Sequence, residues 1–208
     1  MGEILPTKTL ISGHKKFKNE FSNNEKLFLD LANKGQHPKV LWIGCSDSRV
    51  VPEQIIGVGP GELFVHRNIA NIIPPKNSNE NCTNSVLEYA VNALQVNHIV
   101  ICGHTECGGI KGVLNNSPSD NDTAINHWLK NALPAKDKIL SNNTDQKKIY
   151  LETIKENVLV QKEHLLSYKY INEKYLSGNL RIHAWLYNLH HGEISTFNTE
   201  NNLWEKLS

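Results

Sequence analysis

Residues 40–49 read Val-Leu-Trp-Ile-Gly-Cys-Ser-Asp-Ser-Arg, an apolar run that ends directly in a cluster of reactive side chains. A short, continuous apolar run is typical of a strand that is buried on both faces, as in a parallel sheet. Residues 98–107 repeat the pattern, because the apolar run 98–102 is followed by His104 and Cys107. In open parallel sheets, ligands bind beyond the carboxyl ends of the strands, so both clusters are expected to project into a functional site.

Helical and strand-like segments alternate along the rest of the chain. Ser85 and Glu88 have the spacing of a capping box and predict a helix there. Gly178 predicts the end of a helix just before it, because glycine is the preferred residue at that position. Further helices are predicted at 15–33, 123–133 and about 145–176, and strands at 40–44, 62–66, 98–102, 181–187 and 193–197, the last two forming a hairpin.

This alternation predicts an α/β fold whose mainly parallel sheet of about four strands has an antiparallel edge strand and is flanked by helices. A length of 208 residues predicts a single domain over 1–208. Within it we expect an N-terminal helical arm over 1–35 and a catalytic core over 36–200.

The composition excludes several classes of function. Lys and Arg number 22 against 21 Asp and Glu, so no basic excess points to nucleic acid or to an anionic membrane surface. No apolar run approaches the roughly 18 residues that a membrane span needs. The N-terminal segment lacks the apolar stretch of a signal peptide, which predicts a cytoplasmic protein.

Three of the reactive side chains are preferred zinc ligands. The chain has 4 cysteines, too few for a disulfide scaffold, and we assign Cys82 and Cys102 to packing. Cys45, His104 and Cys107 differ, because each follows a predicted strand and lies beside ionisable groups. Thiolate and imidazole both suit zinc, and three protein ligands leave a position for water, which is the catalytic arrangement.

Asp47 and Arg49 lie two residues apart in the same cluster. An ordinary ion pair explains most such pairs. Beside a metal, however, the carboxylate can accept a proton or a hydrogen bond from bound water, while the guanidinium holds it away from the ion. The two motifs together therefore indicate a metal site with an acid–base group.

Three runs resemble the β-class carbonic anhydrases: LWIGCSDSRVVPEQI at 41–55, PGELFVHRNIAN at 60–71 and ICGHTECGGIKG at 101–112. The resemblance extends from about residue 10 to 200. It implies one Zn²⁺ per chain, reversible hydration of CO2 to bicarbonate and a proton by zinc-bound hydroxide, and self-association as a dimer or tetramer.

The resemblance also assigns roles to individual residues. It implies that Cys45, His104 and Cys107 bind zinc and that Asp47 and Arg49 form the catalytic dyad. The substrate pocket that it implies consists of Gln36, Phe64, Ile69, Tyr89 and the backbone amide of Gly108.

One subgroup of the family binds a second, regulatory bicarbonate ion, and the matching residues here are Trp42, Arg67 and Tyr187. Indole, guanidinium and phenol groups are all hydrogen-bond donors and suit an anion. In that state Asp47 would become a fourth zinc ligand. Pro52 argues against it, because this subgroup usually has its proline one position earlier and the plant-like subgroup has it here.

Three alternatives remain open from the sequence. A zinc-free hydrolase would use Cys45 as nucleophile and His104 as base, but it leaves Cys107 without a role. A zinc-bearing binding module would have a closed site with four ligands and no turnover. A zinc hydrolase of a CO2 analogue, COS or CS2, would use the same scaffold.

Overall fold

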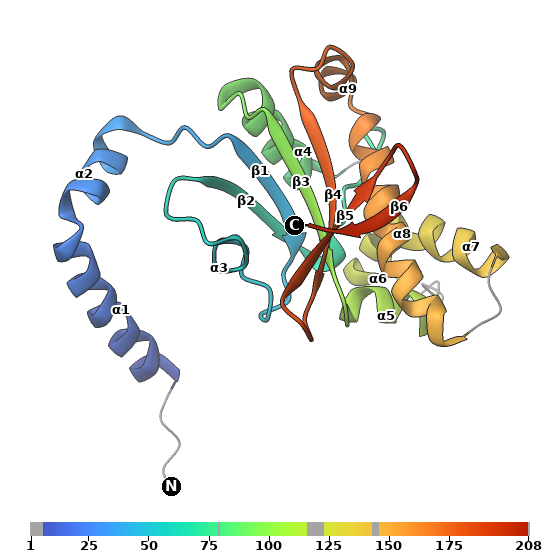
Figure 1. Ribbon diagram of the computed structural model, residues 1–208, viewed down its shortest axis with the longest axis horizontal. Helices are drawn as coiled ribbons and strands as arrows, with labels where there is room; N and C mark the ends of the chain where they lie inside the picture. The colour runs from blue at the N-terminus through green and yellow to red at the C-terminus, as the bar shows by residue number, and fades with distance from the viewer. Residues whose placement is uncertain (1–5, 79, 116–122, 143–145, 208) are drawn as a thin grey trace, which may run out of the picture. The chain divides into compact units, whose positions relative to one another are not determined.

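The structure is a computed structural model that describes residues 6–78, 80–115, 123–142 and 146–207 (Figure 1). The chain divides into two compact units, Met1–His37 and Pro38–Ser208. The second unit contains the whole sheet. It confirms the predicted α/β fold, with a mostly parallel sheet, flanking helices and antiparallel strands at one edge.

The N-terminal unit contains two helices, α1 (Pro6–Asn23) and α2 (Glu25–Lys34). The prediction of a single helix over 15–33 is therefore wrong at Asn24, where the chain forms two helices instead of one. Asn24 leaves the helical conformation, and its side-chain amide donates to the carbonyl of Glu20. The rings of Phe21 and Phe28 stack at 4.8 Å across this break, so the apolar residues of the two helices pack against each other.

The sheet has six strands in the order β2-β1-β3-β4-β5-β6. The first four in this order are parallel, and β5 and β6 are antiparallel additions at one edge. All five predicted strands are present, while β6 was missed because four residues, two of them charged, give no clear alternation. The strands are β1 (Val40–Cys45), β2 (Leu63–Asn68), β3 (His98–His104), β4 (Arg181–Asn188), β5 (Glu193–Asn198) and β6 (Leu203–Lys206).

The helices of the second unit cover the two faces of the sheet unequally. On one face, the main core joins residues of β1 and β3 to Leu87 of α4, Val158 of α8 and Ile171 of α9. On the other face, Trp42 and its neighbours pack against Ile56 of α3. The helices are α3 (Pro52–Ile56), η1 (Ile69–Asn71), α4 (Asn81–Glu88), η2 (Tyr89–Ala93), α5 (Gly108–Asn115), α6 (Ala124–Leu129), η3 (Lys130–Ala132), α7 (Leu133–Asn142), α8 (Gln146–Leu166) and α9 (Lys169–Leu176).

Two helix predictions need correction. The helix after residue 80 exists, but Ser85 is not its cap, because the helix already begins at Asn81 and the Glu80 side chain accepts from the amide of Cys82. The helix predicted over 145–176 is interrupted between α8 and α9. Gly178 does follow the end of α9, with a φ of 74°, as predicted.

No helix within the described part of the chain is long and apolar enough to cross a membrane.

Candidate metal centre

Cys45, His104 and Cys107 come together at the carboxyl ends of two paired strands. Cys45 ends β1, His104 ends the adjacent β3, and Cys107 directly precedes α5. One ligand atom from each of these side chains lies within 4.8 Å of the others. Ligand atoms around a tetrahedral zinc ion lie about 3.5 to 4 Å apart, so the three side chains need only a small adjustment to hold one.

His104 presents a nitrogen that has no hydrogen-bond partner. Its Nδ1 lies 2.8 Å from the carbonyl oxygen of Thr105, so Nδ1 carries the proton and Nε2 has a free lone pair. The side chain is completely buried, and Nε2 is unpartnered among the described atoms. A buried polar atom without a partner is costly, and a cation at this point would remove that cost. The residues present therefore fit a zinc ion.

The surroundings of the two sulfur atoms favour a thiolate at Cys45. The Cys107 thiol, which donates to Cys45, lowers the pKa of Cys45 to about 4 together with the adjacent His104 side chain and the backbone amides of Asp47 and Ala70. The resulting Cys45 thiolate and burial raise the pKa of Cys107, although the amides of Gly109 and Ile110 point at its sulfur. One thiolate thus forms readily, and the second needs a positive charge between the two.

Asp47 and Arg49 form a close two-point contact beside this group. Nε of Arg49 donates to Oδ1 of Asp47 at 2.9 Å, and Nη2 donates to Oδ2 at 2.7 Å. Nη2 also donates to the carbonyl of Glu106 at 3.1 Å, which ties the dyad to the loop of Cys107. Oδ2 of Asp47 lies 3.9 Å from Nε2 of His104. The guanidinium of Arg49 holds the pKa of Asp47 well below its usual range.

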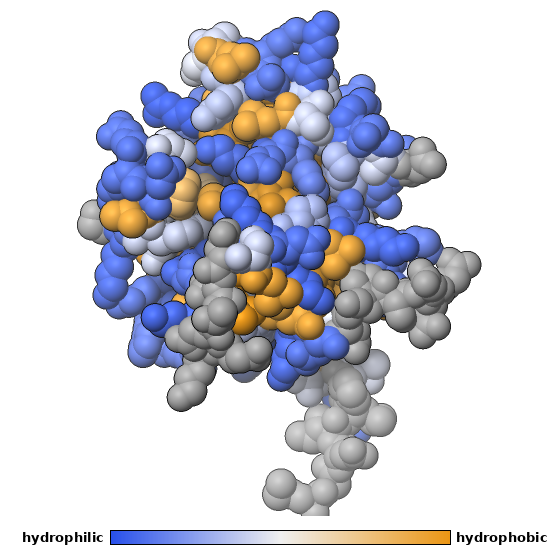
Figure 2. Space-filling model, turned by 90° about the vertical axis from the view of Figure 1, so that its right-hand side faces the viewer, coloured by the Kyte–Doolittle hydropathy of each residue, from blue (hydrophilic) through white to orange (hydrophobic). Residues whose placement is uncertain are grey.

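Ile69 and Gly108, two residues of the expected substrate pocket, line one cavity of about 350 Å³. Ile125 and Leu129 of α6 line it too, and they were not predicted, because their apolar side chains in a helix are typical of ordinary packing. Ile69 and Ile125 are among the exposed apolar side chains of the chain. Apolar patches of this kind interrupt a largely polar surface on the face shown in Figure 2.

Phe64 and Tyr89 contact each other, with ring centroids 5.7 Å apart, but they lie away from the ligands of their own chain. Phe64 pairs with Leu41, four residues before Cys45 on β1, which is about 13 Å along a strand. Gln36 lies in the N-terminal unit, two residues after the end of α2. The part of Gln36, Phe64 and Tyr89 in a substrate pocket therefore stays a prediction.

The three residues assigned to a regulatory anion have unequal surroundings. Trp42 is completely buried, and its indole Nε1 is unpartnered among the described atoms. Tyr187 packs in the same cluster as Trp42. Arg67 reaches the metal loop instead, because it donates from Nε to the carbonyl of Cys45 at 2.9 Å and from Nη2 to that of Asp47 at 2.6 Å. This role of Arg67 was missed, since its acceptors are backbone atoms about 20 residues away.

A family model, related sequences and solved structures all indicate the same protein family for this chain. A model of the family described as "Carbonic anhydrase" matches residues 40–194. The carbonic anhydrase of Synechocystis sp. is 37% identical over 192 residues, which cover 90% of this chain and 70% of that protein. The solved structure of the β-carbonic anhydrase CcaA has a TM-score of 0.92 at 34% identity and covers 97% of this chain and 92% of its own.

A tetrameric β-carbonic anhydrase from Sordaria macrospora has a TM-score of 0.81 at 34% identity, with 92% of this chain and 96% of that one covered. The family match includes β1, β3 and all three residues of the candidate metal centre. On its sequence, its sheet and its Cys/His/Cys group, this chain belongs to the β-class carbonic anhydrases, which are zinc enzymes.

Proposed function

We propose that this chain hydrates CO2 reversibly to bicarbonate and a proton, with Cys45, His104 and Cys107 as the zinc ligands. The observation that carries the assignment is the free, fully buried Nε2 of His104 within a group of three ligand atoms. When bound there, zinc lowers the pKa of water toward neutrality and so supplies a nucleophile for CO2.

Asp47 acts as a hydrogen-bond acceptor beside the metal position. Arg49 keeps its carboxylate charged, and a charged carboxylate can only accept, so it favours an oxygen that carries a proton. The two-point contact with Arg49 fixes the direction of this acceptor. The dyad therefore orients the attacking oxygen rather than supplying a ligand while this ion pair is intact.

CO2 is small, neutral and apolar, so its pocket needs apolar walls and few donors. Ile69 and Ile125 supply such walls in the cavity that Gly108 also lines. Gly108 begins α5, where backbone N–H groups have no acceptor inside the helix and can hold a substrate oxygen. We assign substrate positioning to this N–H group.

Stopped-flow CO2 hydration, with zinc measured on the same sample, tests the proposed function. We expect about one zinc per chain and turnover that disappears when zinc is removed and returns when it is restored. Hydrolysis of COS or CS2 without CO2 hydration would favour the related zinc hydrolase. Activity that is independent of zinc would favour the cysteine hydrolase, and bound zinc without turnover would favour a binding module.

We propose that the active site is completed by a second copy of the chain. Phe64 and Tyr89 lie away from the ligands of their own chain, while Tyr89 is 49% exposed, so these rings are available to a neighbour. The related Sordaria macrospora enzyme is a tetramer. Light scattering is expected to show a dimer or tetramer, and an active monomer of 23.5 kDa would contradict the proposal.

We also propose that the protein is cytoplasmic.

A further proposal is a regulatory bicarbonate site formed by Trp42, Arg67 and Tyr187. The buried indole N–H of Trp42 lacks an acceptor among the described atoms, and a bound anion would supply one. Bicarbonate there would compete for Arg67, release the loop of Asp47 and let this carboxylate reach the metal. The expected result is inhibition by bicarbonate and a steep loss of activity below neutral pH.

Trp42→Phe tests this regulation, because it keeps an aromatic ring and removes the N–H group. CO2 hydration should be measured against pH and added bicarbonate in wild type and variant. We expect the variant to lose the inhibition that exceeds simple product competition. If the wild type itself shows one ordinary titration and product competition alone, the regulatory site does not exist.

A further inference from the structure

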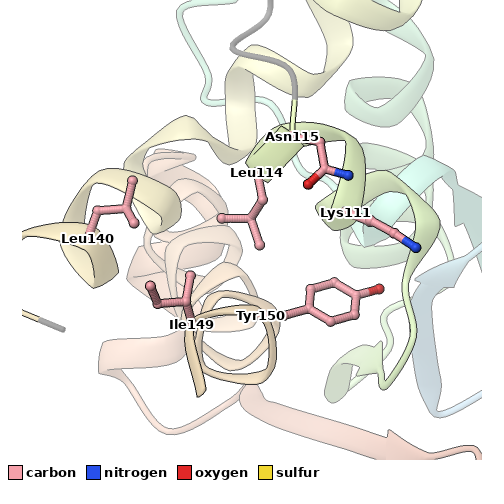
Figure 3. A pocket seen from close by; sticks show the side chains of 6 residues that line it. All are labelled: Lys111, Leu114, Asn115, Leu140, Ile149 and Tyr150. Carbon is pink, nitrogen blue, oxygen red and sulfur yellow. The ribbon is translucent and has the colours of Figure 1, made fainter. Parts of the chain in front are cut away.

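Helix α8 contacts the loop that carries Cys107 and also η1, whose Ala70 amide points at the sulfur of Cys45. The first contact is made by Tyr150, whose hydroxyl donates to the backbone carbonyl of Cys107 at 2.8 Å. Tyr150 lies at one edge of a cavity of about 350 Å³ that α5, α7 and α8 enclose. Its hydroxyl points away from the apolar side chains of Leu140 and Ile149 (Figure 3). The ring fills space in this wall, while the hydroxyl group is directed at the metal loop.

The second contact is made by Asn157, which is buried and donates from Nδ2 to the carbonyl of Ala70 at 3.1 Å. Its Oδ1 accepts from Nε2 of Gln161 at 2.9 Å, and this bond fixes the orientation of the amide. Ala70 has a φ of 62°, a conformation that residues with a Cβ rarely adopt and that persists only where the surroundings hold it. In this conformation the amide of Ala70 points at the sulfur of Cys45.

The two contacts come from one rigid element. Positions 150 and 157 are seven residues apart, about two helical turns, so they share a face of the 21-residue helix α8. We propose that α8 sets the separation of the Cys45 and Cys107 sulfur atoms, with Tyr150 and Asn157 as positioning residues. The proposal rests on the zinc site proposed above. Neither residue has a signal in the sequence near the ligands, because each acts through a backbone carbonyl.

The matched controls remove similar hydrogen bonds at places that do not contact the segments around Cys45 and Cys107. The hydroxyl of Tyr168 also contacts a backbone carbonyl, that of Pro74, at 2.9 Å, and in addition the side-chain oxygen of Asn84. Tyr168→Phe therefore removes the same type of bond as Tyr150→Phe and one further contact, which makes it the more severe change for the fold. The buried hydroxyl of Thr153 donates to Ile149 within α8 itself, so Thr153→Val is the control for Asn157→Leu.

The test measures zinc release from the purified enzyme into a chromogenic chelator, and the absorption spectrum of the cobalt-substituted enzyme. Loss of a group that orients a ligand typically lowers metal affinity about 10- to 100-fold. We expect Tyr150→Phe and Asn157→Leu each to release zinc about 10-fold faster and to shift the thiolate-to-cobalt bands. Both controls should stay within about 2-fold of wild type with an unchanged spectrum, even if they lower the unfolding temperature.

The outcomes separate this proposal from the zinc site itself. A wild-type protein without zinc would overturn the proposed function. A zinc-loaded wild type whose Tyr150→Phe variant keeps the wild-type release rate and cobalt spectrum would overturn the role of α8 alone. Equal acceleration in Tyr150→Phe and Tyr168→Phe would also overturn it, because α8 would then act through general stability. Tyr150→Phe keeps the ring, so the test does not depend on Asn157→Leu folding well.

Discussion

Replacing Cys107 by serine is expected to remove most of the bound zinc and to lower kcat/KM for CO2 hydration by more than about 100-fold. Loss of a group that merely orients a ligand already costs about 10- to 100-fold in affinity or activity, and loss of a ligand costs more. Serine is nearly isosteric with cysteine, but its hydroxyl does not ionise to replace the second thiolate. Cys107 is 1% exposed and directly precedes α5, and because serine has a similar shape, the backbone should fold as before.

Cys102→Ser is the matched control for this variant. Cys102 is also 1% exposed and lies on β3, but it does not belong to the ligand group. Burial raises the pKa of Cys102 to about 12, so it stays a thiol, and it packs with Trp42 and Val100. We expect Cys102→Ser to keep about one zinc per chain, whatever it costs in unfolding free energy. Full zinc occupancy in Cys107→Ser would overturn the ligand assignment.

The sequence predicted the ligands because in this fold the chemistry directly follows the most regular elements. Cys45 and His104 belong to or follow apolar runs that are typical of buried strands, and these runs become the adjacent β1 and β3. Side chains at the same end of two neighbouring parallel strands must lie close together. The pairing of Asp47 with Arg49 is equally local, since it spans two residues.

What the sequence did not show depends on contacts between distant segments. The helix break at Asn24 has no glycine or proline to mark it, and the rings of Phe21 and Phe28 stack across it. The capping-box spacing at Ser85 occurs inside a helix, because Glu80 provides an earlier start. The spacing of residues within one helix cannot show which of two possible caps begins that helix.

The same limit applies to the site. Phe64 was expected beside CO2, but its place on β2 puts it far from Cys45 of its own chain. Sequence spacing cannot tell a pocket built within one chain from one built by two. The groups that hold the backbone around the ligands are also invisible in the sequence, since Arg67 and Asn157 bond to backbone carbonyls of remote residues, Cys45 and Ala70.

Asp47→Asn is expected to keep zinc and yet to lower the turnover of CO2 hydration by about 100-fold or more, the usual contribution of a positioned acid–base group. The amide is neutral and can present N–H2 toward the metal position, where the carboxylate can only accept. A loss of turnover with zinc retained separates this dyad from the ligands, whose replacement removes the metal. Asp137→Asn, the same change at an exposed site on α7, should leave both zinc and turnover unchanged.

The pH profile gives the second measurement for this variant. Arg49 depresses the pKa of Asp47 in the folded chain, so the stability that the pair contributes is present above about pH 4, the unfolded value, and is lost as the pH falls through the depressed one. Between roughly pH 6 and 9 the carboxylate therefore stays charged, so its own titration does not shape the activity profile in this range. Asp47→Asn should consequently lower turnover across this whole range. A variant within about 3-fold of wild type throughout would show that Asp47 has no part in orienting the attacking oxygen.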